Sequence, residues 1–116
     1  MLAQYLDVAP QINASGTFSY VIDVSNYDYC LIQPIGVSVT ISSTIDGGAV
    51  QGVTDGNSNL ATNFVATKAL NVNDNATLTS TLSSTNTYRL GVVGRYVKIT
   101  SGATINKCLV MLAKIS

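Results

Sequence analysis

Residues 94–100 read GRYVKIT, a stretch in which apolar and polar side chains alternate. Val97 and Ile99 fall on one face of an extended chain, and the residues between them fall on the other. This period of two predicts a half-buried β-strand. After a short SGAT turn, residues 105–115 read INKCLVMLAKI and are apolar at both parities. Such a run is typical of a strand that is covered on both faces.

Outward from these two strands, the pattern recurs along most of the chain. Further strands are predicted at residues 17–24, 28–35, 37–45, 63–67, 76–82 and 88–93. Turn signals such as DGG at 46–48 and NVNDN at 71–75 separate them. Short strands at this spacing predict an antiparallel β-sandwich of about seven or eight strands, jelly-roll-like in character. We expect one domain over residues 1–116.

The composition agrees with an all-β fold and with a weakly charged surface. The chain has 13 Thr, 12 Ser and 10 Asn, and it has neither Glu nor His. Only 10% of its residues are charged, against about 25% in ordinary soluble domains. The formal net charge is zero, so little electrostatic repulsion keeps copies apart. This favours a protein that self-associates or packs into an assembly.

Several function classes find no support in the residues. Without His there is no imidazole base for a nucleophile, and without Glu the carboxylates are six scattered Asp residues. We therefore expect no enzyme and no cofactor. Six scattered cations make no nucleic-acid stripe. No apolar run reaches the length of a membrane span, and residues 1–15, MLAQYLDVAPQINAS, do not resemble a signal peptide.

Metal and disulfide chemistry are also weakly indicated. The run DGNSN, residues 55–59, resembles the start of a calcium loop but lacks its Gly and its closing Glu. It and residues 71–75 are better explained as turns, so we expect no metal. Cys30 and Cys108 lie in apolar strand-like runs. Buried free thiols are favoured, and a disulfide is the alternative.

The N-terminal residues 1–16 look like a lead-in to the domain, and they form a candidate docking segment. Leu2, Tyr5, Leu6 and Val8 make a short apolar stripe that Pro10 interrupts. We predict these four residues as contacts with a partner protein. The alternative is that they cover the core of their own domain.

Two tyrosines in NYDYC, Tyr27 and Tyr29, are further interface candidates. Tyrosines near loops stack on sugars or on protein partners. The simpler explanation is that Tyr29 is half-buried and that Tyr27 lies over a sheet edge.

The order of these motifs resembles a known class of domain. VTISSTIDGG (39–48), TYRLGVVG (87–94), RYVKIT (95–100) and CLVMLAKI (108–115) follow one another as in the small β-sandwich domains of virion proteins of tailed bacteriophages. The resemblance covers residues 37–115. The chain departs from that pattern in having no Trp, a longer middle segment and Lys98 where Arg is common.

The resemblance implies a non-enzymatic structural component of a bacteriophage virion, assembled in the host cytoplasm. A capsid auxiliary or decoration protein that binds a repetitive protein lattice is the leading expectation. Other virion proteins, such as major capsid or tail proteins, and further copies of the chain would be its partners. The alternatives are a tail- or fibre-associated adhesion component and a carbohydrate-binding module that uses Tyr27, Tyr29 and the loop at residues 46–59.

Overall fold

The computed structural model describes residues 2–45, 64–91 and 96–115, and the regular secondary structure of these residues is β-strand apart from one six-residue helix. The elements are β1 (Leu2–Asp7), α1 (Ala9–Ala14), β2 (Ser19–Asp23), β3 (Tyr29–Ile35), β4 (Val39–Thr44), β5 (Val65–Ala66), β6 (Ala69–Asn71), β7 (Leu78–Thr79), β8 (Thr81–Leu82), β9 (Tyr88–Gly91), β10 (Tyr96–Ser101) and β11 (Lys107–Lys114). Among these, β5, β7 and β8 are only two residues long. The predicted all-β class is confirmed.

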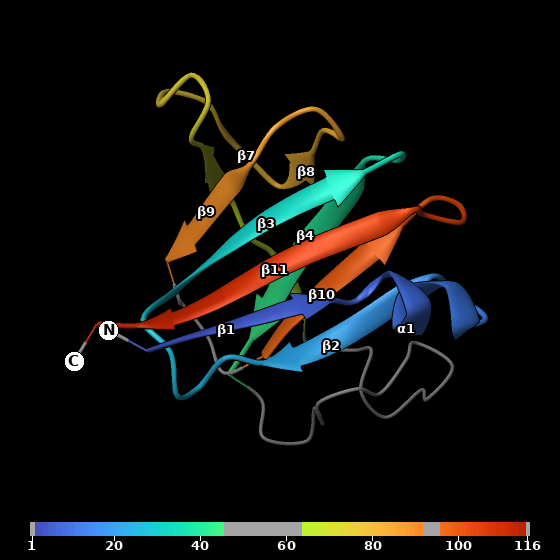
Figure 1. The fold of residues 1–116 in the computed structure, drawn as a ribbon, viewed down its shortest axis with the longest axis horizontal. Coiled ribbons are helices and arrows are strands. Elements are labelled where there is room, and N and C mark those ends of the chain that lie inside the picture. Colours follow the sequence, from blue (N-terminus) through green and yellow to red (C-terminus); the bar gives the residue numbers. More distant parts are fainter. Residues whose placement is uncertain (1, 46–63, 92–95, 116) are drawn as a thin grey trace.

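Two antiparallel sheets form the sandwich. The first has six strands in the order β1-β11-β3-β9-β6-β7, and the second has the order β2-β10-β4-β5, with β8 also paired to β4. In Figure 1, β11 and β3 pass in front of β10 and β4. Strands that follow each other in sequence are therefore often in different sheets, and the last strand, β11, lies between β1 and β3 in the first sheet.

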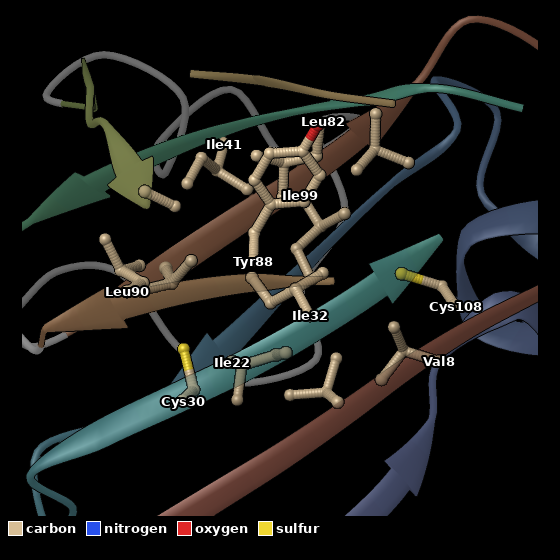
Figure 2. Close-up of a cluster of buried hydrophobic side chains, with 14 of the residues drawn as sticks. Val8, Ile22, Cys30, Ile32, Ile41, Leu82, Tyr88, Leu90, Ile99 and Cys108 are labelled. Carbon is tan, nitrogen blue, oxygen red and sulfur yellow. The ribbon is translucent and has the colours of Figure 1, made fainter. Parts of the chain in front are cut away.

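The core lies between the sheets and consists of the apolar side chains that alternate with polar ones along the strands. Val97 and Ile99 are buried there, as their shared parity predicts. Figure 2 shows side chains from both sheets meeting in this layer. Its labelled members are Val8, Ile22, Cys30, Ile32, Ile41, Leu82, Tyr88, Leu90, Ile99 and Cys108. Tight burial of branched aliphatic side chains is the main stabilising contribution to such a fold.

The other face of β10 accounts for its aromatic residue and its cation. Tyr96 is buried in a small second cluster with Val21, and Phe64 packs against them. The ammonium of Lys98 lies 4.8 Å from the centroid of the Phe64 ring. Both side chains thus have structural roles on the outer side of the second sheet. Arg95 lies outside the described residues.

The segment predicted as an N-terminal lead-in is part of the sandwich, which corrects that expectation. All six residues of β1 pair with β11, from Leu2 opposite Lys114 to Asp7 opposite Leu109. Pro10 does not end an apolar stripe, because it occupies the first turn of α1. A missing N–H costs nothing at that position.

Proline has no backbone N–H and is confined to the ends and edges of sheets, and the pairing of Pro34 shows a local edge. β3 continues for one residue beyond it and stays paired with β11. On its other side, β3 pairs with β9 only from Tyr29 to Ile32. Pro34 therefore lies where β3 has one neighbour, which suits a residue without a backbone donor.

The prediction of one strand at residues 76–82 is wrong. The stretch divides at Ser80 into β7, which pairs with β6, and β8, which pairs with β4 in the other sheet. A single strand would put Leu78 and Leu82 on one face, but Leu78 is exposed and Leu82 is buried in the core. Because the chain crosses between sheets here, the period of two does not carry through.

Candidate interaction surface

One row of side chains crosses the outer face of the six-stranded sheet. Residues directly opposite in antiparallel strands point to the same side, so the pairing register defines the row. This outer row consists of Tyr5, Met111, Leu31, Arg89, Leu70 and Leu78. The alternate residues on the long strands, such as Val110 and Ile32, belong to the core. The outer row therefore points away from the core.

The outer row is apolar except for Arg89. Tyr5 is 76% exposed and Leu78 is 60% exposed, and the leucines and the methionine between them are partly buried. A shallow groove of about 280 Å³ runs over β1, β11 and β3. Leu109 and Gln33 line it together with residues of the outer row. Large apolar side chains gathered on one sheet face are typical of an interaction site.

Arg89 is held against this face by an aromatic ring. Its guanidinium carbon lies 4.6 Å from the centroid of the Tyr29 ring. The residue opposite Tyr29 on β9 is Gly91, which has no side chain to compete for that space. The contact places one fixed positive charge in the middle of an otherwise uncharged row.

The predicted contact residues Leu2, Tyr5, Leu6 and Val8 do not form one surface. In a strand, Leu2 and Leu6 point to the core side of the sheet and Tyr5 points to the outer side. Leu6 packs against the core, and Val8 is buried in it. Val8 is therefore corrected from a contact to a core residue. Leu2, at 67% exposed, and Tyr5 stay accessible.

Tyr27 and Tyr29 also lie on different sides of the sheet. The Tyr27 ring packs against the core, and its hydroxyl donates a 2.7 Å hydrogen bond to Oε1 of Gln4. Tyr29 lies on the outer face beneath Arg89. The two rings do not make one stacking platform. The loop at residues 46–59, which was to complete a glycan site, falls outside the described residues.

Two further exposed apolar side chains lie near the two ends of the chain. Leu2 is opposite Lys114, and Ile115 follows directly. Leu2 and Ile115 are both well exposed. Figure 1 shows the two termini next to each other at one end of the sandwich. We call Leu2 and Ile115 the terminal corner.

The two cysteines are buried and free. Cys108 is opposite Pro34, four residues along β3 from Cys30, a separation of about 13 Å that no disulfide can span. Burial raises the pKa of each thiol from 9.0 to about 12, and for Cys108 the charge of Asp7 adds to this. Neither thiol is poised to act as a nucleophile.

The buried thiols predict a loss of stability in alkali. Protonated thiols favour the folded state, so their contribution is complete below pH 9.0 and is lost as pH rises toward about 12. Between about pH 8 and pH 10.5 we expect the free energy of unfolding to fall by roughly 1–2 kcal/mol per thiol. Urea titrations at both pH values measure this change in the free energy of unfolding. A Cys30→Ala/Cys108→Ala variant should lose this part of the dependence, and an unchanged alkaline loss would contradict the assignment.

The turn at residues 71–75 confirms the sequence interpretation of that run. Oδ1 of Asn71 accepts the N–H of Asn73 at 2.8 Å. Oδ2 of Asp74 accepts the hydroxyl of Thr77 at 2.6 Å, and its Oδ1 accepts the N–H groups of Thr77 and Ala76. These hydrogen bonds, the one from the Thr77 hydroxyl above all, lower the pKa of the Asp74 carboxyl. The oxygens thus serve the backbone. Within the described ranges, no three His, Cys, Asp or Glu residues gather as a metal site, and no helix is long and apolar enough to cross a membrane.

Five members of the outer row were missed by sequence reasoning: Met111, Leu31, Arg89, Leu70 and Leu78. The available signal was the double-sided apolar pattern of residues 105–115, which was interpreted as a strand covered on both faces. In the structure, one face of β11 meets the core and the other carries the groove.

Comparison with known proteins gives a likeness of fold. No protein-family model matches the chain, and no curated protein matches it. Among solved structures, the SPBc2 prophage-derived protein YomS is similar, with a TM-score of 0.62 at 10% sequence identity. The match covers 96% of this chain and 92% of that one. The sandwich is therefore a fold that a prophage-derived protein also adopts.

Proposed function

We propose that this chain is a non-enzymatic structural component of a bacteriophage particle, specifically an auxiliary or decoration protein of the capsid. The observation that carries the proposal is apolar surface that the domain does not use for its own core. The outer row and the terminal corner expose Tyr5, Leu78, Leu2 and Ile115 on a chain with zero net charge. Apolar anchors within a polar surround provide affinity and register in protein–protein contacts.

Two further observations support this proposal. The sequence resembles small β-sandwich domains of tailed-phage virion proteins, and the fold is shared with a prophage-derived protein. The chain contains no His and no Glu, which removes the commonest general bases from any catalytic scheme.

The carbohydrate-binding alternative gains less support. Its two tyrosines lie on different sides of the sheet, and Tyr29 is already stacked with Arg89. A glycan array compares the two functions. A saccharide that binds the chain and is lost in Tyr29→Ala would favour the alternative.

Quantitative mass spectrometry of purified particles tests the proposed function. Particles of the phage that encodes the chain are purified by density gradient and compared with the total lysate. We expect the chain to co-purify with the major capsid protein in many copies per particle. A non-structural phage protein from the same lysate is the control. A chain that is abundant in the lysate and depleted from particles to the level of that control would overturn the proposal.

A further inference from the structure

We infer that the outer face of the six-stranded sheet binds a second copy of this chain, face to face. The inference rests on the proposed function only in taking this face as a protein-binding surface. Beyond the proposed function, the inference identifies the partner as a second copy of this chain.

The outer row is complementary to itself when its order is reversed. A two-fold axis parallel to the strands, between β11 and β3, produces this reversal. Tyr5 then lies opposite Arg89 of the second copy, and Met111 lies opposite Leu31 of the second copy. The first pair places a guanidinium on an aromatic ring, and the second is an aliphatic contact. Each pair occurs twice across the axis.

The single cation of the row fixes where the axis can lie. An axis along β9 would place two Arg89 side chains opposite each other, which is unfavourable in a desolvated interface. The axis between β11 and β3 separates them by about three strand spacings, or roughly 14 Å. Lys107 lies on the same face at the first position of β11, where its exposed side chain extends to solvent at the rim of the contact, and the net charge of the chain is zero. One cation in an apolar row is too few for a nucleic-acid or acidic lipid surface.

The area of the face is that of a weak, transient interface. The four strands β1, β11, β3 and β9 span about 19 Å across, at about 4.8 Å per strand. The eight residues of β11 extend about 26 Å. The strands β1, β11, β3 and β9 have six, eight, seven and four residues, so each copy contributes roughly 400 Å² at about 3.3 Å per residue. The pair contributes about 800 Å², which is the size of a weak, transient contact. We therefore expect a weak dimer, with the two sheets packed at about 30°.

Sedimentation velocity over a concentration series measures the dimer and its dependence on Tyr5. Because Tyr5 is exposed, Tyr5→Lys should fold normally, which circular dichroism verifies. The new charge faces Arg89 of the second copy, so we expect the dissociation constant to rise at least about tenfold. Tyr5→Ala, which adds no charge, should weaken the dimer several-fold.

Two further variants make the test specific to this arrangement. Leu78→Lys adds the same charge at an exposed position of the same row, but β7 lies beyond the four overlapping strands. It should leave the dissociation constant unchanged. The double variant Tyr5→Lys/Arg89→Glu places opposite charges across the axis and should recover the dimer relative to Tyr5→Lys alone.

Three results would overturn the inference: a monomer at all concentrations, a trimer or larger species, or a dimer that Tyr5→Lys does not weaken. Equal weakening by Leu78→Lys and Tyr5→Lys would refute the stated axis. The particle experiment distinguishes this failure from that of the proposed function. A chain that is monomeric in solution yet abundant in purified particles refutes the second copy and retains the structural role. A chain that forms the dimer but is absent from particles retains the second copy and refutes the structural role.

Discussion

Replacing Ile99 by alanine is expected to lower the free energy of unfolding by about 2–5 kcal/mol. Ile99 is 0% exposed and lies in β10 between Ile41 on β4 and Tyr20 on β2. The variant removes three buried carbon atoms and leaves a cavity that two flanking strands prevent from closing. The total free energy of unfolding of a domain is about 5–15 kcal/mol, so this loss is a large part of it. Urea unfolding followed by circular dichroism gives the value.

The chain provides a matched control for this substitution. Ile45→Ala makes the same chemical change at a residue that is 80% exposed. It should alter the free energy of unfolding by no more than about 0.5 kcal/mol. Similar small losses in both variants would mean that β10 does not lie in the core.

Asn13→Ala is expected to cost about 2–4 kcal/mol, because it removes two hydrogen bonds to one buried residue. Nδ2 of Asn13 donates to the carbonyl of Ile105 at 2.8 Å, and its Oδ1 accepts the N–H of Ile105 at 2.9 Å. The side-chain amide thus pairs with Ile105 as a neighbouring strand would. Without the Asn13 side chain, the backbone N–H and carbonyl of Ile105, whose side chain is 1% exposed, lose their hydrogen-bond partners.

Thermal unfolding and amide hydrogen exchange test this role. Asn13→Ala should lower the melting temperature and speed exchange at Ile105, while Asn26→Ala, at an exposed position, should do neither. Equal stability of the two variants would show that water replaces Asn13 without cost. The bonds join α1 to the turn before β11 across 92 positions of sequence. We therefore expect exchange to increase at both elements.

The fold class follows from local patterns because the period of two is a property of neighbouring residues. Val39 and Ile41, like Val97 and Ile99, alternate with polar residues and are buried as predicted. The Asn-rich turn at 71–75 is equally local, since its side chains bond their own backbone. An exposed edge strand such as β1 gives no such signal, because both of its faces tolerate mixed residues.

The interaction surface could not be predicted in the same way. The outer row takes Tyr5 from one end of the chain and Met111 from the other, with Leu31 between them. Sequence alone showed an apolar stripe, and it assigned Val8 to a contact when the fold buries it. The period-two patterns determined the sandwich and most of its core, but pairing across distant strands decided which apolar residues stay outside. The physical reason is that register is set by side chains packing across the sheet, so no short window of sequence contains it.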